Sequence, residues 1–208
     1  MNNLEKVLIE ALAEVVEGRD AMTRGHVGRV RVFMGILLDE MAASGVYGAE
    51  MLGIDIDAAV VACQLHDVGK IGFTDGILSK KEALSDGDFE FLKMHTALGG
   101  RIIDKMLESA PDNIVLQYAK VIAQSHHERW DGGGYHKGLK GEEIPLLGRV
   151  MAVVDVYDAL ISKRPYKEAF SHEKAVEIIK NDDGIHFDPA IVNLFSKIHH
   201  KFEEAALS

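Results

Sequence analysis

The chain has 208 residues, of which 47% are hydrophobic and 27% charged, and its formal net charge is −10 at pH 7. This composition is typical of a soluble globular protein with one core, and the acidic balance argues against partners that bind basic patches, namely nucleic acid polymers and anionic membranes. The only cysteine, Cys63, excludes an intrachain disulfide and favours a reducing, cytoplasmic location. No apolar stretch is long enough to span a bilayer, and the N-terminus lacks the layout of a signal peptide.

Apolar residues recur at steps of three and four residues along the first half of the chain, which predicts helices. A first helix ends near Gly18, and a second begins at His26. The run AAVVACQL is apolar on all sides and predicts a central buried helix that ends at His66 and Asp67. Residues 1–19 therefore form an N-terminal helix, whose narrow apolar stripe fits a linker, a dimer contact or simple packing on the domain that follows.

The second half of the chain keeps the helical period. Start signals for further helices stand at four places: Asp112 or Asn113, Pro145, Ser171 and Asp188-Pro189. No alternating strand pattern of useful length is present, so the sequence predicts an all-α fold with one domain over residues 20–208. The longest loops are rich in glycine and turn residues, and such loops on a rigid scaffold commonly carry function.

Histidines and carboxylates gather at the ends and in the apolar runs of these helices. They are His26, His66, Asp67, His95, His126, His127 and Asp155. Imidazole nitrogens and carboxylate oxygens together form a ligand set for divalent transition metals. A charge at Asp67 or Asp155 is costly in an apolar run unless something positive holds it. Two adjacent histidines, about 100° apart on a helix, converge on one metal only near a helix end, and His126 and His127 fall at such an end.

Other interpretations of single residues remain open from the residues alone. Asp67 and Asp155 could form buried salt bridges, although no basic residue is expected beside them on the same face. An imidazolium that stabilises a helix C-terminus would explain one of His126 and His127, but hardly both. Of the other histidines, His172, His199 and His200 are expected on the surface, and His186 is expected to orient a loop.

Five motifs occur in order: HDVGK, HHERWDGGGY, EEIPLLGRVMAVVDVYDAL, KRPYK and HFDP. Together they closely resemble the HD-GYP domain, a branch of the HD metal-dependent phosphohydrolases, over roughly residues 20 to 197. The resemblance implies an all-α HD-type fold, a centre of two or three metals with iron or manganese favoured, and hydrolysis of the bacterial second messenger cyclic di-GMP. It further implies that His26, His66, Asp67 and Asp155 hold a first metal and that His95, His126 and His127 hold a second, with Asp67 bridging the two.

The sequence departs from the family pattern at two positions. The triplet that names the family ends in proline, but here it reads Gly134-Tyr135-His136. Some members carry a glutamate four residues before the first histidine, where this chain has Met22, whose thioether is a poor ligand for iron(II) or manganese. The nearby acidic residues Glu17 and Asp20 are expected to face solvent. We therefore expect two divalent metal ions rather than three.

Substrate contacts are expected around this centre. Asp67 and Lys70 are the candidate catalytic residues, and Lys70, Arg164 and Lys167 are candidate donors to phosphate. Gly133 of the glycine run and Tyr135 are candidate contacts to a base or ribose, whereas Trp130 fits either a base contact or packing of the loop.

The leading hypothesis is a phosphodiesterase that converts cyclic di-GMP to pGpG, GMP or both. One alternative is an HD phosphohydrolase that acts on another nucleotide, such as a hybrid cyclic dinucleotide. Another is a non-catalytic signalling module that binds cyclic dinucleotide or a partner diguanylate cyclase. An upstream sensor or receiver domain and a homodimer are further partners that the resemblance implies.

Overall fold

The regular structure of the chain is helical. The computed structural model describes residues 3–19, 25–78, 80, 85–163 and 168–207. In chain order the α-helices are α1 (Asn3–Glu17), α2 (His26–Ser44), α3 (Gly48–Met51), α4 (Ile56–Ala62), α5 (Asp75–Leu78), α6 (Asp86–Leu107), α7 (Ile114–Ser125), α8 (Leu146–Ile161), α9 (His172–Asn181) and α10 (Pro189–Ala206). Short 3₁₀ helices are η1 (Cys63–Leu65), η2 (Val68–Gly72) and η3 (Gly141–Glu143). The described residues hold no β-strand, only one isolated bridge between Asp183 and Phe187, which confirms the all-α prediction.

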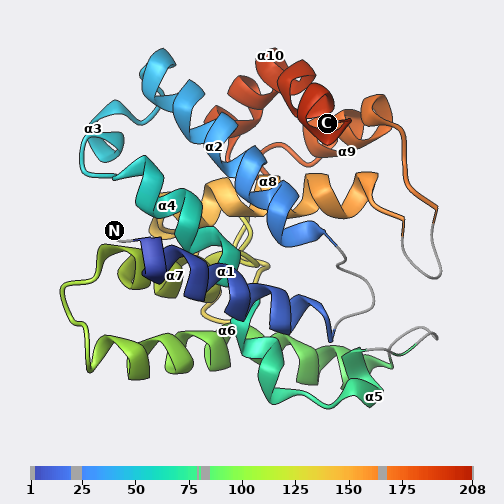
Figure 1. Cartoon of the computed structure of the whole chain (residues 1–208). Coiled ribbons are helices and arrows are strands. Elements are labelled where there is room, and N and C mark those ends of the chain that lie inside the picture. Colours follow the sequence, from blue (N-terminus) through green and yellow to red (C-terminus); the bar gives the residue numbers. More distant parts are fainter. Residues whose placement is uncertain (1–2, 20–24, 79, 81–84, 164–167, 208) are drawn as a thin grey trace.

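Helix α8 forms the centre of the core. Its residues Val150, Met151, Val153 and Val154 are fully buried, as the uninterrupted apolar run predicts. Helices α2, α7, α9 and α10 all pack against it. Figure 1 shows α8 crossing the middle of the fold, with α10 at the top of the view and α6 at the bottom. Asp155, near the middle of α8, is therefore held on a rigid element.

The segment after α4 carries His66 and Asp67 into the candidate site. Asp55 caps α4 by accepting a hydrogen bond from the backbone N–H of Ala58 (3.0 Å). The helix continues through η1 into a turn that holds His66 and Asp67. Gly69 then lets η2 lie directly on α6, because a Cβ atom there would stand 1.9 Å from the carbonyl oxygen of His95. This close contact places Asp67 beside α6.

Helix α1 packs on the outside of this arrangement. Its residues Ile9, Ala13 and Val16 are buried, and the helix contacts η1, η2, α2 and α4. Leu4 and Leu8 on the same helix remain exposed. Within the part of the chain that the structure describes, we find no helix with the length and apolarity that a membrane crossing requires.

A buried ion pair ties α8 to the start of α10. Arg149 donates to Asp188 (Nη1 to Oδ2, 2.8 Å), and both side chains are almost completely buried. Asp188 also caps α10, since its Oδ1 accepts from the backbone N–H of Ala190 (2.8 Å). Tyr47 donates to Asp188 Oδ2 as well (2.8 Å). The predicted start of the last helix at Asp188-Pro189 is thus confirmed.

Asp188→Ala should strongly destabilise the protein, because it removes the cap of α10 and leaves the Arg149 guanidinium buried without its carboxylate. We expect a loss of about 3–5 kcal/mol in the free energy of unfolding, measured by urea titration. Glu50→Ala is the matched control: Glu50 accepts from the same guanidinium (3.1 Å) but is 46% exposed, so its loss should cost less than about 1 kcal/mol. Equal losses in the two variants would contradict this account.

Candidate metal centre

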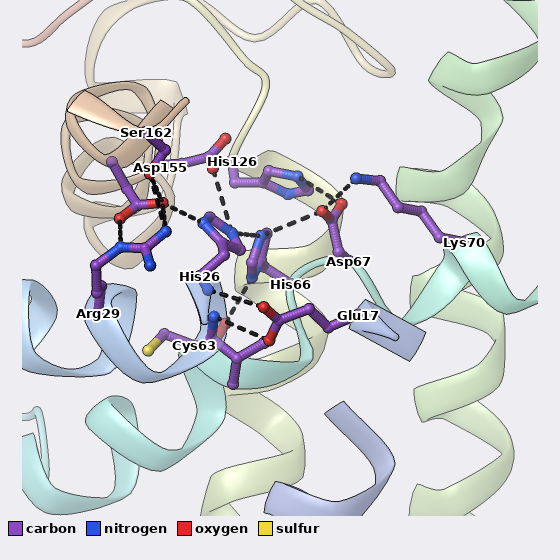
Figure 2. Close-up of polar contacts among 12 residues, drawn as sticks. Glu17, His26, Arg29, Cys63, His66, Asp67, Lys70, His126, Asp155 and Ser162 are labelled. Atoms are coloured by element: carbon purple, nitrogen blue, oxygen red, sulfur yellow. Dashed lines mark hydrogen bonds and ion pairs between the residues drawn. The ribbon is translucent and has the colours of Figure 1, made fainter. Parts of the chain in front are cut away.

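The first group of candidate ligands lies where α2 begins. His26 is the first residue of α2, and His66 and Asp67 lie in the turn between η1 and η2. His26 Nε2 lies 3.1 Å from His66 Nε2 and 3.6 Å from Asp155 Oδ1. Figure 2 shows these side chains converging from α2, from the turn and from α8. One ligand atom from each of His26, His66 and Asp67 lies within 4.8 Å of the others, close enough to hold one ion.

The second group lies where α7 ends. His126 is the C-cap of α7, His127 follows it, and His95 lies on α6. His95 Nε2 and His126 Nε2 are 3.3 Å apart. The ring centroid of His127 lies 5.1 Å from that of His95 and 4.1 Å from that of His126. The two adjacent histidines thus share one cluster at a helix end, the arrangement that their spacing requires.

Asp67 lies between the two groups. Its Oδ2 faces His66 Nε2 at 3.4 Å and Lys70 Nζ at 2.7 Å. Its Oδ1 faces His95 Nε2 at 3.2 Å and His126 Nε2 at 3.8 Å, yet this buried oxygen makes no hydrogen bond to any residue that the structure describes. Leaving a buried carboxylate oxygen unsatisfied is costly. A divalent cation would satisfy it, so the donor set fits the metals that the sequence predicts.

Hydrogen bonds at the far side of the imidazole rings fix their orientation. The Nδ1 atoms of three histidines donate to backbone carbonyl oxygens: His66 to Cys63 (2.9 Å), His95 to Leu92 (2.7 Å) and His126 to Ile122 (3.0 Å). A carbonyl oxygen only accepts, so each Nδ1 carries the proton and each Nε2 presents a lone pair to the centre. Such bonds are characteristic of metal-ligating histidines.

His26 is oriented by a carboxylate instead. Its Nδ1 lies 2.8 Å from Asp158 Oδ2, and Arg29 holds the other oxygen of Asp158 at 2.5 Å. Sequence reasoning missed both partners. A signal was present, because Asp158 follows Asp155 by three residues and therefore shares its helix face.

Burial and charge set the protonation of the candidate ligands. Burial lowers the pKa of His95 and His126 and lowers that of His127 to about 3, so these imidazoles are neutral, the form that binds metals. Burial opposes ionisation of Asp67, but Lys70 and His66 hold its pKa well below the usual value. Burial also opposes protonation of His66, but Asp67 raises its pKa on balance, so a proton would compete with a metal there.

The glycine-rich loop folds back over the second group. Tyr135 donates its backbone N–H to the carbonyl of His127 (3.1 Å), and the two ring centroids lie 4.8 Å apart. Gly134 permits this approach, because a Cβ atom there would stand 2.3 Å from the backbone nitrogen of Arg129. Buried Glu128 accepts from the backbone N–H groups of Lys137 (2.7 Å) and of Leu139. Glu128 was not singled out in the sequence, although an acidic residue directly after two candidate ligands was a usable signal.

Of the other predicted site residues, some lie in the described part of the chain and some lie outside it. Lys70 lies beside Asp67, which corrects the expectation that no basic residue accompanies that carboxylate. Gly133 is exposed and donates its N–H to Asp131 Oδ1 (2.8 Å), and its contact with substrate stays a prediction. Three positions lie outside the described residues: Met22, Arg164 and Lys167.

Two expectations about charged residues are wrong. Glu17 does not face solvent, since both of its oxygens accept from the backbone at the start of α2. His172 and His199 are not simple surface residues either. His172 is bonded to Tyr157 Oη (2.8 Å) and to His199 Nδ1 (2.8 Å), because α9 and α10 pack together there. Asp20 lies outside the described residues.

Comparisons with known proteins agree with this fold. The model of the HD domain family matches residues 37–191. A cyclic di-GMP phosphodiesterase of Vibrio cholerae is 42% identical, over 94% of this chain and 40% of its own length. A 3'3'-cGAMP-specific phosphodiesterase of the same organism is 35% identical, over 93% of this chain and 35% of its own length. The chain thus spans less than half of each relative.

Solved structures share the fold at low sequence identity. The crystal structure of a cyclic GMP-AMP specific phosphodiesterase of Vibrio cholerae has a TM-score of 0.58 and 17% identity, over 95% of this chain and 50% of the other. The chain belongs to the HD domain family, which binds divalent metals. The ordered motifs of the sequence resemble those of the HD-GYP branch of that family.

Chelation should lower the melting temperature, because a metal bound only by the native state stabilises that state. At a free metal concentration one hundred times Kd, the stabilisation is about 2.7 kcal/mol. Differential scanning fluorimetry with and without manganese measures the change, and Asp67→Asn should respond less to added metal. An unchanged melting curve after metal removal verified by elemental analysis would contradict the assignment.

Proposed function

We propose that this domain is a metal-dependent phosphodiesterase that hydrolyses cyclic di-GMP to pGpG, GMP or both in bacterial second-messenger signalling. The observation that supports a catalytic centre is the buried Oδ1 of Asp67, which faces two imidazole nitrogens and has no hydrogen bond. The relatives that share most of this chain are named as phosphodiesterases of cyclic dinucleotides.

The proposed centre holds two ions, iron or manganese. His26, His66, Asp67 and Asp155 would hold the first ion, and His95, His126 and His127 the second, with Asp67 shared between them. Imidazole nitrogen and carboxylate oxygen suit these metals. The one thiol is no competing ligand, because Cys63 is buried and its Sγ donates to the carbonyl of Val60 (3.2 Å). When bound, two divalent ions lower the pKa of water and offset the charge of a phosphodiester.

The residues of the chain orient the reaction. Asp67 is anionic and only partly exposed, so it can position a water molecule while its charge attracts the metals. Lys70 places its ammonium group 2.7 Å from Asp67, at the edge of the centre, where it can contact a phosphate oxygen. Tyr135 is held over His127, with Lys93 Nζ 5.5 Å from the centre of its ring, and it is a candidate contact to a base at the edge of the centre.

Two alternatives remain distinct from this proposal. One relative is named for 3'3'-cGAMP, so a hybrid cyclic dinucleotide is a second candidate substrate. A non-catalytic module that binds nucleotide or a diguanylate cyclase is the other. The complete donor set argues against the latter, because a module without turnover has no need to bring seven candidate metal ligands together.

An assay of two substrates tests the function directly. Protein loaded anaerobically with iron(II), or with manganese, is incubated with cyclic di-GMP or with 3'3'-cGAMP, and the products are resolved by chromatography. We expect pGpG or GMP from cyclic di-GMP, at a higher kcat/KM than for the hybrid. Preference for the hybrid would correct the substrate, and no product from either by protein with verified metal would refute the enzyme.

Replacing Asp67 and replacing Lys70 should have different effects on metal content and on the kinetic constants. Asp67→Asn should abolish turnover and reduce bound metal, because the carboxylate is the shared ligand. Lys70→Met keeps the length of the side chain, and it should retain the metal content while raising KM or lowering kcat by about 10-fold or more through the loss of a charge-assisted bond. Loss of metal from Lys70→Met with an unchanged KM would show that the assignment of Lys70 is wrong.

A further inference from the structure

Helix α2 starts without a cap from its own sequence neighbours. Its N-cap residue is Gly25, which has a left-handed backbone (φ 73°) and no side chain to accept a hydrogen bond. No acidic residue lies in its first turn. The first N–H groups of a helix lack intrahelical partners, and at this end of α2 the first helical residue is the candidate ligand His26.

Glu17 supplies the missing cap from another helix. It is the last residue of α1, and its Oε1 accepts from the backbone N–H of His26 (2.8 Å). Its Oε2 accepts from the backbone N–H of Val27 (3.3 Å). Figure 2 shows the Glu17 carboxylate pointing at the start of α2, with dashed lines to its backbone. A carboxylate at this place also interacts favourably with the helix dipole.

Both the backbone and the side chain of His26 are thereby held in place. Glu17 holds its backbone nitrogen, and Asp158 holds its Nδ1. Its Nε2 then has one direction left, toward His66 and Asp155. Helix α1 also packs against η1 and η2, the two 3₁₀ helices that flank the turn with His66 and Asp67. The N-terminal helix therefore contacts both the start of α2 and the segments on either side of that turn.

We propose that Glu17 is a positioning residue for the metal held by His26, His66, Asp67 and Asp155, and that α1 is a functional part of the centre. This inference rests on the proposed metal centre, but not on the identity of the substrate. A role confined to helix capping would lower stability and leave metal affinity unchanged. A positioning role would weaken the first metal site and spare the second, since Glu17 makes no recorded hydrogen bond to His95, His126 or His127 among the described residues.

The test measures metal affinity in four proteins: the parent, Glu17→Gln, Glu17→Ala and the control Glu14→Ala. Glu14 is an exposed residue of the same helix, so its loss should leave both sites intact. Manganese is titrated into chelated protein and followed by elemental analysis and by electron paramagnetic resonance, in which two coupled ions differ from a single one. The melting temperature of each metal-free variant is recorded alongside.

In Glu17→Ala one of the two manganese affinities should fall by about 10- to 100-fold, the usual effect of removing a residue that orients a ligand, while the other stays at the parental value. The signal of coupled ions should then give way to that of a single ion. Glu17→Gln keeps an acceptor without the charge and should lie between this variant and the parent. If Glu17→Ala does not fold, Glu17→Gln decides by the same readout. Two manganese ions bound with parental affinity in the Glu17 variants would overturn the proposal, whatever their melting temperatures. A protein that shows this dependence on Glu17 but cleaves no cyclic dinucleotide would refute the proposed function instead.

Discussion

The structure of this domain depends on the attraction between one partly buried carboxylate, Asp67, whose Oδ1 is inaccessible to solvent, and the positive charge that must accompany it. An ionised carboxylate loses several kcal/mol of hydration when it is buried, and it recovers that energy only from close opposite charge or good hydrogen bonds. Lys70 supplies one partner, at Oδ2. The other oxygen, Oδ1, faces imidazole nitrogens and has no hydrogen bond to the described residues. A bound metal ion would supply the positive charge that this oxygen lacks.

The surrounding helices form the scaffold that holds the metal ligands around Asp67. The candidate ligands come from α2, α6, α7 and α8 and from the turn after η1, so no short segment of the chain could assemble the centre alone. Four of the imidazoles are aimed by a bond on the far side of the ring, to a carbonyl oxygen in His66, His95 and His126 and to Asp158 in His26. This second layer of bonds makes the positions of the ligands a property of the whole fold and keeps the rings in the tautomer that binds metal.

Much of this was readable in the sequence, and the remainder was hidden for a physical reason. Helical periods and caps such as Asn113 and Ser171 are local signals, so the all-α fold and most helix boundaries followed from them. The candidate ligands stood out because charged or imidazole side chains in apolar runs are rare. The contact of His26 with Asp158 joins residues 132 positions apart, and the bond from Glu17 crosses between two helices. Both depend on tertiary packing, which a single sequence does not display.

The most direct test of this account is anomalous X-ray diffraction from crystals of the manganese-loaded protein. We expect two fully occupied manganese sites per chain, with Asp67 as a ligand of both, His26, His66 and Asp155 at one, and His95, His126 and His127 at the other. Three fully occupied sites would contradict the inference drawn from Met22. Manganese bound elsewhere, or an Asp67 carboxylate with no metal beside it, would contradict the central claim that this carboxylate is the shared ligand of a two-metal centre.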